Sequence, residues 1–197
     1  MAAAGVAAEV SVPDGLPNIL KDPQAFNGIS DRMERSRALF TEAGKVIQSH
    51  RCLNCHPNGD SPTQGPTQGN ATHLHYPPVT RGPHDIGVVG MKCVTCHQDH
   101  NLEQARVPGA PNWHLAPKSM AWAGKNLREI CEGLKDPKRN GNKTMDQLIE
   151  HFAQDPLVGW GWHPGSGRKP APGTQKQMGD LIGAWIANGA ACPKDGG

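Results

Sequence analysis

Cys-Leu-Asn-Cys-His at residues 52–56 and Cys-Val-Thr-Cys-His at residues 93–97 are two copies of one pattern in a chain of 197 residues. In each copy two thiols stand about one helical turn apart, and an imidazole follows the second thiol directly. The remaining two of the six cysteines lie outside the pattern. The duplication therefore indicates two similar sites, each built from two thiols and one imidazole.

This pattern is the attachment sequence of haem c. Its two thiols can add to the two vinyl groups of one porphyrin, and the adjacent histidine then offers its imidazole to the iron as the proximal ligand. The sequence thus predicts two covalent haem c groups. The residues that attach and ligate them are Cys52, Cys55 and His56 for the first and Cys93, Cys96 and His97 for the second.

Paired cysteines also occur in zinc sites and in redox-active dithiols. Zinc sites also use Cys-x-x-Cys pairs, and two pairs 41 residues apart can form one. The histidine directly after both pairs favours haem, because zinc does not require it. A redox-active dithiol needs only one pair, within an alternating strand and helix pattern that this sequence lacks.

The composition is poor in the side chains that fill a protein core. Apolar residues make up 36% of the chain and aromatic residues 5%, whereas glycines number 24 and prolines 18. Two haems would supply large apolar groups to such an interior. The formal charge of +2, without a basic run, does not indicate a nucleic-acid partner. No apolar stretch approaches the roughly 20 residues of a membrane span, so no membrane span is expected.

The chain divides into an irregular N-terminal segment, residues 1–29, and a single domain, residues 30–197, that contains both motifs. The stretches between the predicted helices are rich in glycine and proline, and no convincing strand pattern is present. We therefore expect a mainly α fold in which long loops surround two covalent haems. Helical periodicity and capping residues predict helices at residues 31–50, 123–134, 144–154 and 174–188.

Cys131 and Cys192 are the two cysteines outside the motifs. A disulfide between them would restrict the unfolded chain, and we favour it over two unpaired buried thiols or a thiolate that binds an iron. Covalent haem c is normally attached outside the cytoplasm, so the periplasm is the expected compartment. Residues 1–8 are small and apolar, which fits the remnant of a removed signal peptide or a flexible tail.

Both ends of the domain resemble class I cytochromes c. Residues 44–56 resemble the first helix and haem motif of that family, in which a glycine and an apolar pair precede the first cysteine. Gln48 departs from the family pattern, which often has an aromatic residue there. Residues 180–186 resemble the family's C-terminal helix, whose aromatic residue packs across the N-terminal helix. The resemblance implies cytochrome c-like terminal helices, with the second haem in the insertion between them.

A resemblance that covers more of the chain is to the cytochrome subunits of isoquinoline 1-oxidoreductases. It is carried by the phrases Gly-Ala-Pro-Asn-Trp-His-Leu-Ala-Pro at residues 109–117, Val-Gly-Trp-Gly-Trp at 158–162 and Pro-Ala-Pro-Gly-Thr-Gln at 170–175. The family name implies electron transfer for a molybdenum hydroxylase, which would make such an enzyme a candidate partner. The chain contains no sign of a molybdenum site of its own.

The motifs assign the proximal ligands but leave the sixth ligand of each iron open. We rank His75 and His151 first, Met120 and His114 next, and His163 behind them. His75 follows the first motif in a loop, and His151 lies on a predicted helix beside apolar residues. His163 precedes the last helix, where class I cytochromes place their methionine ligand. The other candidates are His73, His84, His100 and Met91.

The sequence is most consistent with a carrier that moves electrons from an extracytoplasmic dehydrogenase to a downstream redox protein. Thioether ligation raises the reduction potential relative to two imidazoles, so different distal ligands would make the two haems unequal. The alternatives are a dihaem redox enzyme, such as a peroxidase or a sulfur-compound oxidoreductase, and a haem-based gas or redox sensor. We expect a carrier rather than an enzyme.

Overall fold

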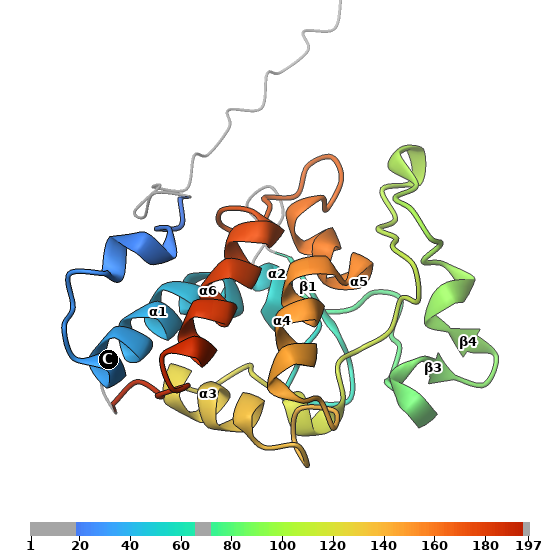
Figure 1. The fold of residues 1–197 in the computed structure, drawn as a ribbon. Helices are drawn as coiled ribbons and strands as arrows, with labels where there is room; N and C mark the ends of the chain where they lie inside the picture. The colour runs from blue at the N-terminus through green and yellow to red at the C-terminus, as the bar shows by residue number, and fades with distance from the viewer. Residues whose placement is uncertain (1–18, 66–71, 195–197) are drawn as a thin grey trace, which may run out of the picture.

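The computed structural model describes residues 19–65 and 72–194, and Figure 1 shows their arrangement. The expected leader at residues 1–8 and most of the irregular segment 1–29 lie outside the described residues. Helices, with short 3-10 turns included, account for 44% of the described part. Its six α-helices are α1 (Arg32–Ile47), α2 (His50–Leu53), α3 (Leu127–Lys135), α4 (Met145–Gln154), α5 (Pro156–Gly159) and α6 (Gln175–Ala187).

The described part also contains four strands, although the sequence has no convincing strand pattern and predicts a mainly α fold. The strands form two antiparallel pairs, and each strand has only two residues. Elements this short cannot show the alternating apolar pattern by which a strand is predicted. The fold is therefore mixed, with a helical part and a loop-rich part. The pairs are β1 (Thr63–Gln64) with β2 (His73–Leu74), and β3 (Gly87–Val88) with β4 (Met91–Lys92).

The longer helices begin at capping side chains that the sequence largely predicts. Asp31 caps α1 by accepting a hydrogen bond from a backbone N–H three residues later, at 2.8 Å. Thr144 forms the predicted capping box at the start of α4. Asn126 caps α3 in the same way, so this helix begins at Leu127 and not at the predicted residue 123. Among the described helices, none has both the length and the apolar character needed to cross a membrane.

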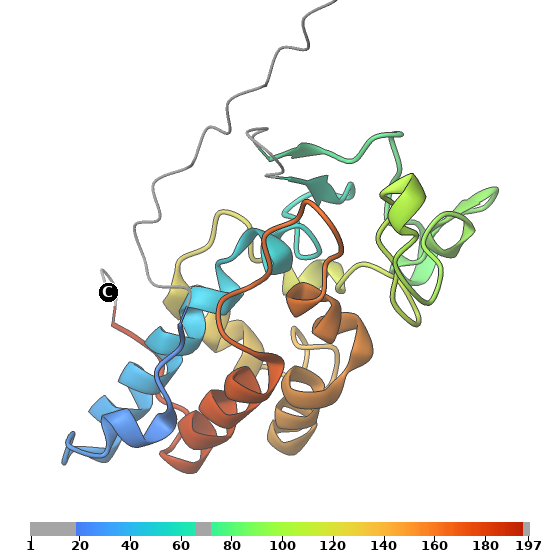
Figure 2. The same cartoon turned by 90° about the horizontal axis from the view of Figure 1, so that it is seen from above.

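The core lies where α6 packs against α1 on one side and against α4 on the other (Figure 1, Figure 2). Trp185 of α6 is fully buried, and its ring centre lies 4.7 Å from that of Phe40 in α1. Its indole N–H donates to the carbonyl of Ala191 at 3.0 Å, and its own carbonyl accepts from the hydroxyl of Ser36. The predicted apolar face of this helix is confirmed, because the structure buries Met178, Leu181, Ile182 and Trp185.

At Gly179, α6 comes so close to α4 that an added Cβ atom would lie 2.4 Å from the Cβ atom of Ala153. We expect Gly179→Ala to force the helices apart and to lower the free energy of unfolding by about 1–3 kcal/mol. The matched control is Gly183→Ala, one turn later in α6, where the nearest atoms would be 3.9 Å away. There alanine should be neutral or stabilising, because it is the better helix former. Urea unfolding measures both variants, and equal stabilities would contradict this prediction.

A disulfide joins Cys131 in α3 to Cys192 in the segment after α6, with their Cα atoms 5.6 Å apart. The predicted pairing is confirmed. The two alternatives for these cysteines, unpaired thiols or a thiolate ligand to iron, are therefore wrong. The bond fixes the C-terminal segment to the helical core across 61 residues of chain.

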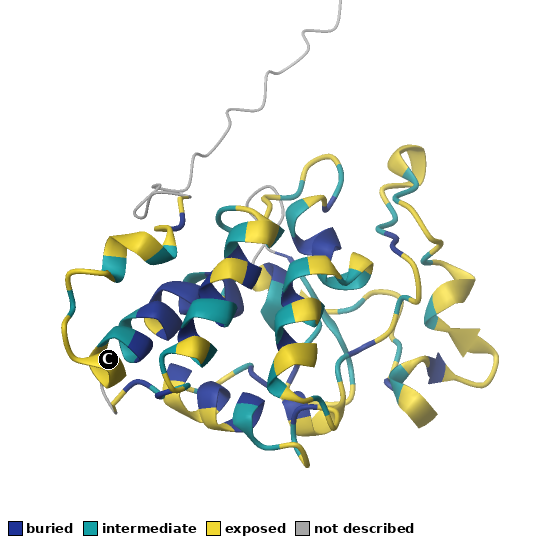
Figure 3. Cartoon of the chain, viewed as in Figure 1, coloured by how far each residue is buried: buried dark blue, intermediate teal, exposed yellow. Residues whose placement is uncertain are grey.

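Residues 72–108, here called the hairpin segment, form a loop-rich part at one side of the helices (Figure 1, Figure 2). The main apolar cluster draws on none of the described residues between 54 and 115. The segment exposes large apolar side chains instead (Figure 3), with Val89 at 95% exposure and Tyr76 at 79%. Its apolar side chains are thus largely unused by the protein's own core. Those that stand exposed are Leu74, Tyr76, Ile86, Val88, Val89, Met91 and Val94.

Candidate haem-binding sites

The first motif is formed at the end of α2, directly after α1. Cys52 lies within α2, and the backbone N–H of His56 donates to the carbonyl of Cys52 at 3.1 Å. This turn brings the two thiols and the imidazole of the motif together. Burial raises the pKa of the Cys52 thiol to about 12 and that of the Cys55 thiol to about 11. Both cysteines are free thiols and are kept in their protonated form.

The imidazole of His56 is held by a carbonyl and by an aromatic ring. Its Nδ1 lies 2.7 Å from the carbonyl oxygen of Met120, and its ring stacks on Trp122 with centres 3.5 Å apart and planes 3° from parallel. A carbonyl only accepts, so Nδ1 carries the hydrogen and Nε2 keeps its lone pair. Burial, as the largest cause, lowers the pKa of His56 to about 3, which keeps the ring neutral. A neutral imidazole oriented through its other nitrogen is the usual state of a metal-binding histidine.

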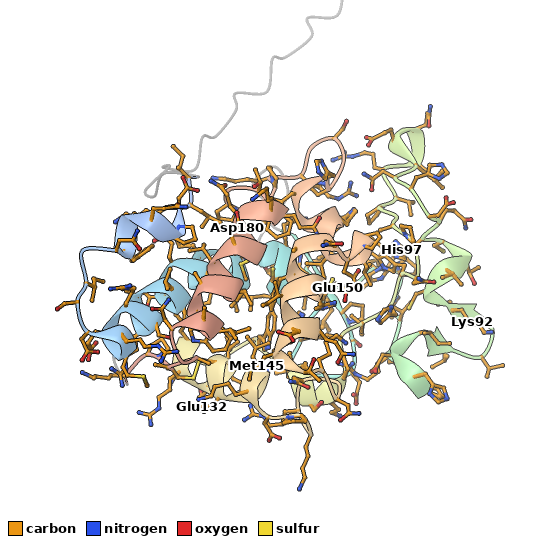
Figure 4. The ribbon with its side chains drawn as sticks, in the orientation of Figure 1. Lys92, His97, Glu132, Met145, Glu150 and Asp180 are labelled. Carbon is orange, nitrogen blue, oxygen red and sulfur yellow. A yellow bond between two sulfur atoms is a disulfide. The ribbon has the colours of Figure 1, made fainter. Side chains whose placement is uncertain are left out.

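The second motif repeats this arrangement outside the helical core. A 3-10 turn, Cys93–Thr95, follows β4, and the N–H of His97 donates to the carbonyl of Cys93 at 3.0 Å. The Nδ1 atom of His97 donates to the carbonyl of Pro108 at 2.7 Å, and its ring stacks on Trp113 with centres 4.6 Å apart. Burial is the main cause that lowers the pKa of His97. Figure 4 shows His97 on the side of the hairpin segment that faces the helices.

One stretch of chain, residues 113–122, contacts both motifs and is called the strap below. Trp113 at its start stacks on His97, and Trp122 at its end stacks on His56. Between them, the N–H of Ala116 donates to the carbonyl of Cys55 at 3.2 Å. The sequence suggested only that tryptophans here could border a haem. The strap therefore fixes both proximal imidazoles from a single segment.

Arg81 joins the hairpin segment to the strap and to the loop after the first motif. Its guanidinium is paired with Asp85 at 2.6 Å and donates to the carbonyl of Ala116. Its backbone N–H donates to the carbonyl of Asp60 at 2.7 Å. Nothing in the sequence pattern around Arg81 marks it as the centre of this network.

Asn101 is a second residue that sequence reasoning missed. Its side-chain oxygen accepts from the indole N–H of Trp160 and from the backbone N–H of Gly109, both at 3.0 Å. Its side-chain nitrogen donates to the carbonyl of His163 at 3.0 Å. These bonds connect the hairpin segment to the turn after α5. Trp160 and His163 lie 59 and 62 residues after Asn101 in the chain, so no local sequence pattern reveals these contacts.

The distal candidates fall in different places. The ring of His75 lies 5.8 Å from that of His97, whereas His151 stands on α4 and belongs to the charges that lower the pKa of His56. Met120 offers its carbonyl to Nδ1 of His56, which places this residue on the side of the ring away from Nε2. His114 is exposed beside Trp113, at the strap's outer end. His163 is also exposed and precedes α6.

The residues present fit a haem at each motif. Each site combines two thiols with a neutral imidazole whose Nε2 is available, and the segment that contains the second site exposes several large apolar side chains. In the part of the chain described, no three His, Cys, Asp or Glu side chains converge enough to hold a metal ion. A haem does not need such a cluster, because the porphyrin supplies four ligands of the iron itself.

No protein-family model, curated protein or solved structure matches this chain. The assignment of the sites therefore depends on the motifs and on the geometry around His56 and His97. What the two sites share is chemically specific. In both, a backbone carbonyl fixes Nδ1, an indole covers one face of the ring, and Nε2 is left to bind a metal.

Proposed function

We propose that this protein is a dihaem c-type cytochrome that carries electrons from an extracytoplasmic dehydrogenase to a downstream redox protein. The strongest support is that His56 and His97, at the ends of two Cys-x-x-Cys-His motifs, have the same surroundings. In both, Nδ1 is hydrogen-bonded to a backbone carbonyl and the ring stacks on a tryptophan. Bound haem supplies one-electron chemistry at its iron. The protein's part is to attach it, to orient one imidazole toward it and to exclude water.

Each element of the site has a defined role in this proposal. The four motif cysteines form the thioether links, and the strap keeps both imidazoles in their ligating orientation through Met120 and Trp122 at one end and Trp113 at the other. Hydrogen bonds that hold a ligating imidazole tune both its strength as a ligand and the reduction potential of the metal. Because the strap contacts both motifs, electrons would pass between two sites that one segment of the chain connects.

For the first site we propose His151 as the distal ligand. Its Nδ1 donates to the carboxylate of Asp155 at 2.9 Å, which leaves Nε2 available and raises the basicity of the ring as a ligand. Two buried side chains of the same helix, Leu148 and Phe152, belong to the apolar cluster that includes Trp122, the ring that stacks on His56. Met120 is less suitable at this site, because its carbonyl already binds the opposite nitrogen of His56.

The same proposal includes a more specific description of the fold. The packing of α1 against α6 supports a cytochrome c-like helical part around the first haem, with the hairpin segment as an insertion that holds the second. The resemblance to cytochrome subunits of isoquinoline 1-oxidoreductases supports a molybdenum hydroxylase as electron donor and the periplasm as location. An enzyme that uses a cysteine thiolate is not favoured, because Cys131 and Cys192 form a disulfide.

The proposal predicts the mass and the spectrum of the protein produced in a host that matures cytochromes c. The intact mass should exceed that of the polypeptide by two haems under denaturing conditions, because thioether bonds survive unfolding. The pyridine haemochrome spectrum should give two haems per chain. Carbon monoxide should bind the ferrous protein slowly or not at all, since a carrier has six-coordinate irons. A mass without haem, or with zinc alone in the native protein, would contradict the proposal.

A further inference from the structure

The rings of His75 and His97 lie next to each other in an edge-on arrangement. Their ring centres are 5.8 Å apart, and their planes are inclined by 68°. Two imidazoles on opposite sides of one iron have ring centres about 6 Å apart, because each metal–nitrogen bond is about 2 Å and each ring centre lies about 1 Å further out. The observed separation is close to this value.

In both rings Nδ1 is engaged in a hydrogen bond to a backbone carbonyl. Nδ1 of His75 donates to the carbonyl of Pro77 at 2.8 Å, as Nδ1 of His97 donates to the carbonyl of Pro108 at 2.7 Å. Carbonyls only accept, so each Nδ1 carries the hydrogen and each Nε2 offers a lone pair. His75 thus has an orienting hydrogen bond of the same kind as His56 and His97.

The backbone around His75 is fixed on both sides. The N–H of His75 donates to the carbonyl of Pro62 at 3.0 Å, and the N–H of Tyr76 donates to the side chain of Gln64 at 3.0 Å. The pairing of β1 with β2 places this residue directly after the paired strand. A ligand held by main-chain contacts of this kind loses little entropy when it binds.

We infer that His75 is the distal ligand of the second haem, so that His97 and His75 bind its iron from opposite sides. This inference rests on the proposed function, because it requires a haem attached at Cys93 and Cys96. It assigns His75, which follows the first motif in the sequence, to the second motif. With two imidazoles the second iron is low-spin, has no vacant position and has a lower potential than a His–Met haem. That favours electron transfer over catalysis at this haem.

The test is spectroscopic. His75→Ala should keep two haems per chain by mass, while one of the two ferric haems changes from low-spin to high-spin in the electron paramagnetic resonance spectrum. Added imidazole should restore the low-spin signal by occupying the vacated position. The matched control is His73→Ala, two residues earlier and within β2, which should keep both haems low-spin.

The outcomes separate this inference from the proposed function. Two retained haems that both stay low-spin in His75→Ala would overturn the assignment of His75, and so would a spin change in His73→Ala. A wild-type protein without haem would instead overturn the proposed function. If His75→Ala is not recovered, His75→Met provides a sixth ligand and should raise the potential of one haem alone. Two unchanged potentials in that variant would overturn the inference.

Discussion

If the proposed function holds, a Cys93→Ser/Cys96→Ser variant is expected to lose one of two covalent haems completely and, with it, the compact state of the hairpin segment. Serine cannot form the thioether bonds, so the intact mass under denaturing conditions should fall by one haem. Trypsin should then cut rapidly at sites within residues 72–108, for example after Arg81, Lys92 and Arg106. The wild-type protein should resist cleavage there.

The physical reason lies in how little apolar surface the hairpin segment buries on its own. Seven large apolar side chains between Leu74 and Val94 stand exposed, and two-residue strands contribute few hydrogen bonds. A segment of this kind needs another source of burial to offset the entropy of ordering the chain. A haem between His97 and His75 would provide it, because these side chains could then pack on the porphyrin.

The reciprocal variant, Cys52→Ser/Cys55→Ser, provides the control. These cysteines adjoin α1 and the apolar cluster, of which Cys52 is a partly buried member. Loss of haem from this variant should therefore also lower the midpoint of the cooperative unfolding transition of the helices. In the Cys93→Ser/Cys96→Ser variant the helical circular dichroism and the main transition should change little. A hairpin segment that stays protease-resistant without its haem would contradict this account.

The helices could be predicted because their signals are local. Asp31, Thr144 and Thr174 cap helices at the positions that the sequence indicates, and the apolar period of α6 identifies its buried face. Met33, in the first turn of α1, is 44% exposed, whereas the later large apolar residues of this helix are buried. Periodicity reports which residues share a face and cannot report where the neighbouring element ends.

The sites could be predicted only as far as the motif extends. Cys-x-x-Cys-His identifies the thiols and the proximal imidazoles because their chemistry requires that spacing. A distal ligand would come from loops that meet only in the folded chain, as His75 and His97 do although 22 residues separate them in the sequence. Arg81 and Asn101 were missed for the same reason, since their partners are assembled by tertiary structure and leave no periodic signal.

The disulfide gives the second large expected effect. A Cys131→Ala/Cys192→Ala variant should lose about 4 kcal/mol of unfolding free energy, because the bond closes a loop with a sequence separation of 61 residues in the unfolded chain. Such a loss is a large fraction of the stability of a typical domain, so the urea midpoint should fall strongly. Reduction of the wild-type disulfide should lower the midpoint by a similar amount.

The haem spectra of this variant should not change, because both cysteines are engaged in the disulfide and neither binds an iron. Cys131 is fully buried, so part of the loss could come from the small cavity that alanine leaves. Cys192→Ala alone separates the two contributions, since it breaks the bond and keeps the Cys131 side chain in the core. A loss below about 1 kcal/mol in both variants would mean that the C-terminal segment is held mainly by other contacts. The bond from Ala191 N–H to the hydroxyl of Ser36 at 2.9 Å would then be the first to examine.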